Sequence, residues 1–278
     1  MKKVILFPIL FLLMVSVACK KESKTNEKSV SYEKISLKDE LFLFDDKKHL
    51  GATLEINLDY PCLTDDEQGN GALQSLYSTL VFGEEYAGMS AKEAEDKYVK
   101  AFRAEKKTWE NDYQEMKKMS EEMGFEMRDS LNYYQSLSDT VCYEGQNLLS
   151  FQVQFYNYSG GAHGMTSLLS YVVTLDGVRL KEQDLFQEGY YDALKNLILN
   201  KILLQNNVKS IDELPELGYI NTEGIVPNEN FYLTDKGITY VYVPYEIACY
   251  AMGVSEVFLP YSEIKHLLKA DSPIASLL

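Results

Sequence analysis

The segment 157–164, Asn-Tyr-Ser-Gly-Gly-Ala-His-Gly, holds the clearest candidate for chemistry, since His163 follows two adjacent glycines and precedes a third. An imidazole acts as a general base only when a nucleophile or an acidic partner lies within hydrogen-bonding reach. A zinc site would need further ligands, and the other histidines, His49 and His266, show no ligand spacing with His163. We therefore weigh three roles for His163, in this order: a structural hydrogen bond that fixes the turn, direct contact with a ligand, and catalysis.

The glycines around His163 give this segment a second property, because glycine accepts positive φ and allows another backbone to approach closely. We expect Gly161 to have positive φ. Further along the chain, Tyr245 is expected to pack beside the glycine turn, and Glu246 to open a short helix where its charge suits the helix dipole. The residues proposed for ligand contact are Tyr158, Gly160, Gly161, His163, Gly164, Tyr245 and Glu246.

Motifs for catalysis are missing from the sequence. It contains no G-x-S-x-G, no H-E-x-x-H, no P-loop and no paired Rossmann glycines. Cys249 is expected to be an inert thiol in a buried helix, because Ile247 and Tyr250 flank it. Carboxylates are abundant, so an acid pair of the glycosidase type remains open, although the sequence singles none out. We expect no cofactor and no metal site.

The cysteines separate into one near the N-terminus and three in the body. Cys62, Cys142 and Cys249 form an odd set, so at most one internal disulfide can form. Their spacing matches no zinc pattern. A Cys62–Cys142 bridge is one alternative, and buried free thiols are the preferred one.

The N-terminal segment predicts export and lipidation. Lys2 and Lys3 precede an uncharged run of roughly 15 residues, shorter than the roughly 20 needed to span a membrane. Ser16 and Ala18 lead into Cys19, as a lipoprotein signal peptidase requires. We expect Cys19 to become an acylated N-terminus, carrying palmitate or a related chain, and to anchor the protein outside the cytoplasm, with the outer membrane preferred. Because Leu usually stands where Ser16 does, plain secretion is the alternative.

The composition is strongly acidic, with a formal net charge of −15. Loss of Lys2 and Lys3 with the leader would bring it to about −17. Such a surface excludes nucleic acid as a partner and attracts cationic proteins, with an attraction that salt weakens. The alternative is that the acidity serves solubility alone.

The first half of the body predicts two strands followed by helices. Residues 20–29 are expected to be a disordered tether. Alternating apolar residues predict strands at Val30–Leu37 and at Ala52–Asp59, the second closed by Tyr60-Pro61. Asn70 is expected to cap a helix that ends at Gly83, and Ser90-x-x-Glu93 is a capping box that opens a longer helix. The residues expected on the inner face of this helix are Ala94, Tyr98, Phe102, Trp109, Tyr113 and Met116.

The second half predicts an antiparallel meander followed by a smaller unit of helices and strands. The strands expected in the meander are Asn132–Tyr143, Leu148–Tyr158 and Met165–Leu175. The later elements expected are a helix at Tyr191–Leu204, a turn at Asp212–Leu217, a hairpin of Asn230–Leu233 and Ile238–Val243, a strand at Val254–Leu259 and a helix at Tyr261–Leu268. Helices on antiparallel sheets give an α+β class, with two closely associated subdomains.

Three stretches of the C-terminal half carry a family resemblance. They are Asn157–Gly164, for a Y-x-G-G-A-H-G turn, then Asp184-Leu185-Phe186, and then Asn230-Phe231 followed by Pro244-Tyr245-Glu246-Ile247-Ala248. This half resembles the extracellular domain of RsiV-type anti-sigma factors. The layout of the first half is similar to the partner domain that also accompanies PdaC-type peptidoglycan deacetylases. The resemblance implies a division into 30–125 and 126–278.

The resemblance implies a binding module of the cell envelope, since this pair of domains recognises lysozyme in the anti-sigma factors. We expect no sigma-binding segment, no spanning helix and no deacetylase domain here, so signalling and catalysis do not carry over. The favoured function is a non-enzymatic lipoprotein that binds a lysozyme-like cationic protein or cell-wall glycan such as peptidoglycan fragments. The alternative is a hydrolase or esterase that acts on envelope glycan.

Overall fold

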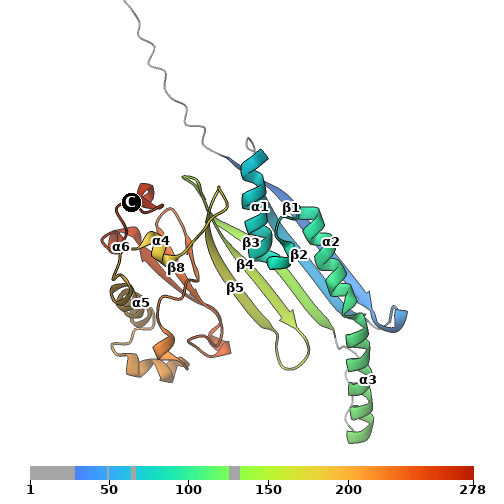
Figure 1. Cartoon of the computed structure of the whole chain (residues 1–278). Coiled ribbons are helices and arrows are strands. Elements are labelled where there is room, and N and C mark those ends of the chain that lie inside the picture. The colour runs from blue at the N-terminus through green and yellow to red at the C-terminus, as the bar shows by residue number, and fades with distance from the viewer. Residues whose placement is uncertain (1–28, 49, 64–66, 125–131) are drawn as a thin grey trace, which may run out of the picture.

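The computed structural model describes residues 29–48, 50–63, 67–124 and 132–278 (Figure 1). The predicted signal peptide, Cys19 and nearly all of the predicted tether lie outside these residues. Within them, every helix is too short or too polar to cross a membrane.

A six-stranded sheet forms the larger part of the molecule. Its strands lie side by side in chain order: β1 (Val30–Phe42), β2 (Leu50–Leu63), β3 (Tyr133–Gly145), β4 (Leu148–Tyr158), β5 (Met165–Thr174) and β6 (Arg179–Leu180). Neighbours are antiparallel except for β2 and β3, which pair in parallel. The expected meander is therefore present, and the first two strands extend the same sheet. The expected division at 125/126 lies within this sheet, because β2 and β3 pair across it.

Three helices lie on one face of the sheet: α1 (Glu67–Phe82), α2 (Ala91–Ala104) and α3 (Lys106–Met123). The Ser90 hydroxyl accepts the N–H of Glu93, and the Glu93 carboxylate accepts the N–H of Ser90, so the predicted capping box is confirmed. Side chains alternate between the two faces of a strand. The helix side of β3–β5 is apolar, with Leu137, Phe151 and Val153 buried in one core.

The C-terminal residues form a second lobe with its own core. Its strands and helices are β7 (Phe231–Leu233), β8 (Gly237–Tyr242), β9 (Ser255–Pro260), α4 (Glu182–Leu185), α5 (Tyr191–Gln205) and α6 (Tyr261–Ile264). Short 3-10 turns occur at Leu43–Asp45, Glu84–Tyr86, Ile211–Leu217, Thr222–Gly224, Tyr250–Met252 and Ala275–Leu277. The expected α+β class with a meander, a hairpin and packed helices is confirmed.

The lobe attaches to the outer face of the sheet, which is the face opposite α1–α3. The N–H of Leu233 donates to the Ser150 hydroxyl at 2.9 Å, and the Asn230 side chain hydrogen-bonds Ser170 N and Leu168 O at the free edge of β5. Only one end of the outer face is used in this way. The other end, toward the β4–β5 turn, stays open.

Four details of the N-terminal half differ from expectation. Strand β2 continues through Pro61 instead of ending before it. Since β3 pairs with β2 only as far as Asn57, the backbone N–H that Pro61 lacks breaks no hydrogen bond between β2 and β3. Helix α1 begins at Glu67, so Asn70 lies inside it instead of capping it. The long helix is divided at Glu105, whose N–H donates to Phe102 O and Arg103 O. Met116 is 37 % exposed because α3 projects beyond the sheet edge.

The last expected helix is shorter than predicted. Helix α6 ends at Ile264, because the following backbone pairs with the segment after α4 instead of continuing the helix. The Gln187 N–H donates to Leu267 O, and the Lys269 N–H donates to Leu185 O. The Asp-Leu-Phe stretch is therefore a docking edge for the C-terminal segment.

Candidate functional site

The glycine turn lies at the tip of the β4–β5 hairpin. Gly160 and Gly161 have φ of +97° and +90°, so the expected positive φ at Gly161 is present. The Tyr158 hydroxyl donates to Gly161 O at 3.0 Å and closes the turn. Gly164 serves a different purpose: a Cβ there would lie 2.4 Å from the Tyr156 ring, so the backbone packs directly on that ring.

His163 is exposed and held by two aromatic residues from the C-terminal lobe. Its ring stacks on the Tyr250 ring with centroids 3.8 Å apart and planes inclined by 14°. Its Nδ1 lies 2.9 Å from Gly164 O, and because a carbonyl only accepts, Nδ1 carries the proton. Its Nε2 faces the Tyr245 hydroxyl at 3.5 Å. The structure thus joins two segments that lie more than 80 positions apart.

Tyr245 packs beside the glycine turn as expected, but the expected helix at Glu246 is absent. Tyr245 has φ of +72°, which no helix accommodates. The Glu246 carboxylate accepts from Asn228 Nδ2 at 2.7 Å and from Val243 N at 3.0 Å. Glu246 therefore fixes the loop and does not contact the His163 cluster.

Tyr250 is the residue of this cluster that the sequence did not reveal. The sequence marks Tyr250 only as a neighbour of Cys249. Cys249 itself lies just before a 3-10 turn and not inside the expected buried helix. The aromatic cluster, defined here as His163, Tyr245 and Tyr250, presents Tyr245 with 47 % of its surface exposed. The sequence did offer one signal for Tyr250. It lies five positions after Tyr245, on the loop that was expected to pack beside the glycine turn.

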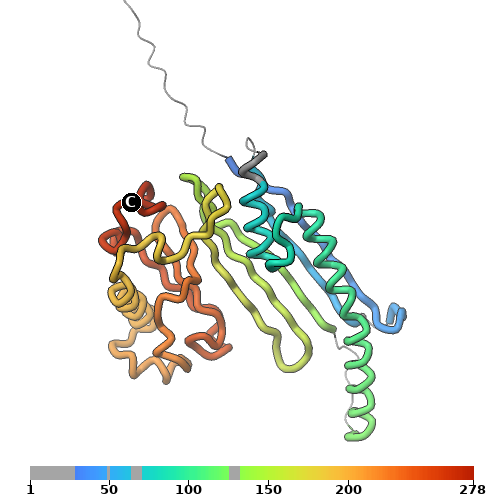
Figure 2. Tube along the Cα trace, in the orientation of Figure 1, coloured from blue at the N-terminus to red at the C-terminus, as the bar shows by residue number. Residues whose placement is uncertain are grey.

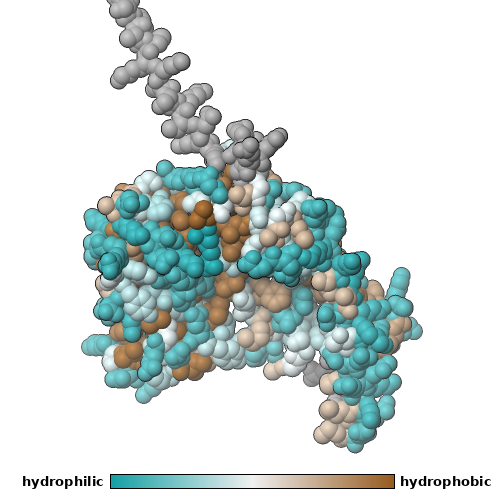
Figure 3. All heavy atoms as spheres, in the orientation of Figure 1, coloured by the Kyte–Doolittle hydropathy of each residue, from teal (hydrophilic) through white to brown (hydrophobic). Residues whose placement is uncertain are grey.

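A groove of about 340 Å³ borders the other side of the glycine turn. It lies between the turn and α3 and is lined by Asp112, Glu115, Met116, Met119, Tyr133, Ser159, Gly160 and Gly161. Figure 2 shows the hairpin tip between α3 and the loop that carries Tyr250. Figure 3 shows the hollow between α3 and the C-terminal lobe, with apolar atoms among polar ones.

The groove combines apolar and acidic groups. Met116 and Met119 are 37 % and 49 % exposed, and Met165 and Leu169, on the helix side of β5, are 48 % and 44 % exposed. Trp109 supports the groove from below, because it stacks on the Tyr133 ring at 5.3 Å. The surface suits a partner that brings both apolar and cationic groups.

Among the described residues, the His163 ring has a tyrosine hydroxyl beside it but no carboxylate. The recorded contacts of His163 are with Gly164, Tyr245 and Tyr250, and none is a carboxylate. Among the described residues, no group of three His, Cys, Asp or Glu side chains could hold a metal ion. The arrangement fits contact with a ligand.

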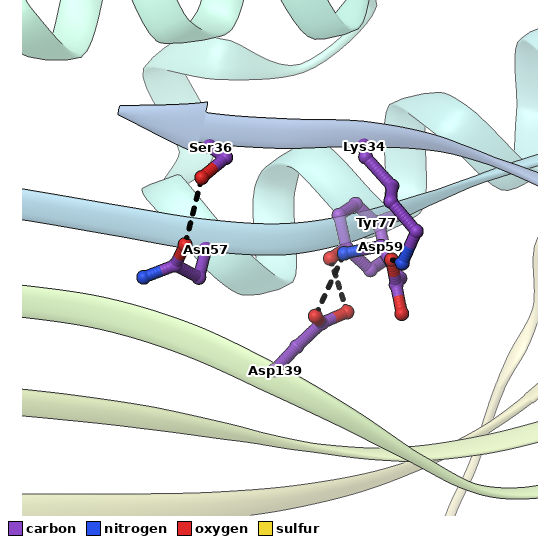
Figure 4. Close-up of polar contacts among 6 residues, drawn as sticks. All are labelled: Lys34, Ser36, Asn57, Asp59, Tyr77 and Asp139. Atoms are coloured by element: carbon purple, nitrogen blue, oxygen red, sulfur yellow. Dashed lines mark hydrogen bonds and ion pairs between the residues drawn. The ribbon is translucent and has the colours of Figure 1, made fainter. Parts of the chain in front are cut away.

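A second polar cluster lies where β2 and β3 separate (Figure 4). The Asp139 carboxylate accepts from Asp59 N at 2.8 Å and from the Tyr77 hydroxyl at 2.6 Å. Burial raises the pKa of Asp139, against the lowering effect of these hydrogen bonds. The Asp59 carboxylate pairs with Lys34 at 2.7 Å. Both carboxylates therefore already have partners within the protein. The Tyr77–Asp139 hydrogen bond connects α1 to β3 at the point where β2 and β3 separate.

Another buried carboxylate belongs to the C-terminal core. Glu182 is 3 % exposed, accepts from the Tyr190 hydroxyl and the Glu229 N–H, and donates its own N–H to the Glu229 carboxylate. Burial raises the pKa of Glu182. The reciprocal bonds join two distant segments and serve the fold.

The three body cysteines are free, so no Cys62–Cys142 bridge forms. Each is half-buried, which makes them more accessible than the buried thiols that were expected. Burial first, and the charge of Glu256 second, raise the pKa of Cys142 to about 11.

Two family models match separate parts of the chain. Residues 51–166 match the family described as deacetylase PdaC, and residues 183–262 match a family described as protein of unknown function (DUF3298). The expected PdaC-type N-terminal domain is confirmed. No curated protein matches the chain significantly.

Two solved structures share the fold. A DUF3298 family member from Bacteroides fragilis is 28 % identical with a TM-score of 0.80, and the match covers 90 % of this chain and 98 % of that one. A DUF3298 family protein from Pseudomonas aeruginosa is 16 % identical with a TM-score of 0.58 and coverage of 87 % and 95 %. The second match shows the fold alone.

Proposed function

We propose that this protein is a non-enzymatic lipoprotein of the cell envelope, anchored through Cys19, that captures a cationic, lysozyme-like protein at the glycine-turn end. The observation that carries the proposal is the joining of the aromatic cluster and the α3 groove at one end of the molecule. That end offers exposed rings, apolar methionines and carboxylates.

Charge supports a cationic partner over a neutral or acidic one at this end. The chain carries a net charge of −15, and the groove contains Asp112 and Glu115. Such a field speeds the encounter with a basic protein and weakens as salt screens it. The apolar side chains of Met116 and Met119 would supply contacts that salt does not screen.

The proposed binding role in the envelope rests on the family resemblance of the sequence. A match to DUF3298 is compatible with the RsiV-type resemblance of the C-terminal half, in which the paired domains recognise lysozyme. The predicted signal peptide and the predicted lipidation of Cys19 support the proposed location.

Calorimetric titration with a c-type lysozyme tests the proposal. Tyr245→Ala should weaken binding at every salt concentration, because it removes an exposed ring from the aromatic cluster. Tyr191→Ala on α5 is the matched control, since Tyr191 is 44 % exposed and lies in the same C-terminal lobe as Tyr245 but outside the aromatic cluster. Absence of heat at low salt, or equal affinities for wild type and Tyr245→Ala, would overturn the proposal.

The hydrolase alternative is less well supported by the geometry. An acid pair must include a carboxyl able to exchange its proton with substrate, whereas Asp59 and Asp139 are committed to Lys34, Tyr77 and a backbone N–H. Incubation with peptidoglycan fragments followed by product analysis distinguishes the two, since the proposed function predicts no released product.

A further inference from the structure

We propose that the open part of the outer sheet face is a second binding surface and that its ligand is an uncharged oligosaccharide. This surface, here called the polar sheet face, comprises outward side chains of β1–β5, and its β5 edge adjoins the C-terminal lobe, where Asn230 Nδ2 donates to Leu168 O. They are Ser36, Asn57, Tyr134, Ser136, Ser138, Gln154, Tyr156, Thr166 and Leu168. The inference does not depend on capture of a protein at the glycine-turn end.

The strand register arranges these side chains in rows. Ser36 pairs with Asn57, Asn57 with Ser138, Ser138 with Gln154, and Gln154 with Leu168. Because residues paired across a sheet point to the same face, the four polar side chains form one line. At about 4.8 Å per strand the line is about 14 Å long, the length of a short oligosaccharide.

The middle of the face carries no charge, although the protein as a whole is strongly acidic. Strands β4 and β5 contain no charged residue. In β3 the charged residues are Glu144, near the strand end, and Asp139, whose carboxylate points to the helix side. The bordering charges on β1 and β2 are ion-paired and leave one net negative charge, since Lys34 pairs with Asp59 at 2.7 Å and Lys38 pairs with both Glu40 and Glu55.

This charge pattern selects the class of ligand. A cationic protein is attracted by carboxylates, which the centre of the face lacks, and an anionic polymer is repelled by a body with a net charge of −15. A neutral ligand rich in hydroxyl groups meets neither attraction nor repulsion. It depends on hydrogen bonds and ring contacts, which this face supplies.

The hydrogen-bonding groups suit hydroxyls. Asn57 Oδ1 is held by the Ser36 hydroxyl at 3.0 Å, and its Nδ2 points away from Ser36 in Figure 4. The amide of Gln154 is exposed beside Ser138. An amide presents donors and an acceptor together, so it can bind neighbouring hydroxyls that both donate and accept.

The tyrosine pair supplies the apolar part of such a site. The rings of Tyr134 and Tyr156 lie 5.9 Å apart. The Tyr134 hydroxyl donates to Glu55 at 2.7 Å, and Gly164 packs against the Tyr156 ring. Both rings are therefore fixed before a ligand arrives, which lowers the ordering cost of binding.

The test uses the full chain in a zwitterionic detergent without sugar headgroups, titrated with cellotetraose and with the tetramer of N-acetylglucosamine. We expect binding of at least one tetramer that is unchanged between low and high salt. Gln154→Ala and Asn57→Ala should each weaken it about fivefold, because each removes hydrogen bonds to the ligand. Asn200→Ala, at an exposed position of α5, should bind like the wild type. Unchanged thermal melting of Gln154→Ala confirms that the fold is intact.

Three outcomes would overturn the inference: no binding of either tetramer at millimolar concentration, binding that neither Gln154→Ala nor Asn57→Ala weakens, or loss of lysozyme binding in these variants without any sugar binding. The last would make the face a protein interface. Failure by either of the first two outcomes leaves the proposed protein capture untouched, because that depends on Tyr245 and on salt.

Discussion

Replacement of Gly161 by alanine should destabilise the protein through backbone strain alone. Gly161 has φ of +90°, a conformation that L side chains rarely adopt. A Cβ there meets no atom within 4 Å, so steric overlap contributes nothing. A residue held in such a region costs about 1–3 kcal/mol. For a body of this size, each kcal/mol lowers the melting temperature by about 2–4 °C.

Gly71→Ala provides the matched control. Gly71 is exposed in α1, and a Cβ there also meets nothing within 4 Å, so the two positions differ mainly in backbone conformation. Alanine in a helix is favoured over glycine by about 0.5–1 kcal/mol, so Gly71→Ala should stabilise the protein. Urea unfolding and thermal melting of the two variants measure the opposite signs. A Gly161→Ala protein as stable as the wild type would refute the strain argument.

Further predictions concern a buried carboxyl, a thiol and the anchor. The raised folded pKa of Asp139 means that its stabilising protonation is present at low pH and lost as pH rises through that pKa. The stability of Asp139→Asn relative to the wild type should therefore rise as pH rises through that pKa, although one amide oxygen cannot accept both the Asp59 N–H and the Tyr77 hydroxyl. Asp139→Ala should lose about 1–3 kcal/mol by stranding the Tyr77 hydroxyl and a backbone N–H. Urea titrations at several pH values decide, and a relative stability of Asp139→Asn that rises on acidification contradicts the sign. Alkylation of Cys142, measured by mass spectrometry, should be slow at pH 8 and accelerate up to about pH 11. Glu256→Gln should make the alkylation faster at a given pH. An alkylation rate that is already maximal at pH 8 contradicts this prediction. Cys19→Ser should release the protein from membranes or leave an unprocessed precursor, and unchanged fractionation with unchanged mass contradicts anchoring.

Much of the sheet was predictable because its strands alternate strictly. From Leu149 to Phe155 the apolar residues of β4 recur at every second position and face the α1 core, whereas Leu148 faces the core of the C-terminal lobe. The parallel pairing of β2 with β3 was not predictable, since the residues between them form helices whose path over the sheet depends on packing. It is this pairing that places the expected boundary at 125/126 inside one sheet.

Part of the site was predictable from composition. Two glycines followed by Ala162 and His163 indicated a turn with positive φ, and the second aromatic segment was expected beside it. The expected helix at Glu246 is absent because the backbone of Ile247 and Ala248 pairs with the segment 219–221 instead of forming helical hydrogen bonds. The stack of His163 on Tyr250 arises from contact between lobes, which no local pattern encodes.

Hydrogen exchange of the protein with and without a c-type lysozyme tests the central claim most directly. The account predicts that binding slows exchange in three segments, 109–119, 159–164 and 244–250, because they form the groove and the aromatic cluster. Exchange in α5 and in β9 should not change. Protection confined to those distant elements, or no protection at low salt, would contradict the claim that the glycine-turn end captures the partner.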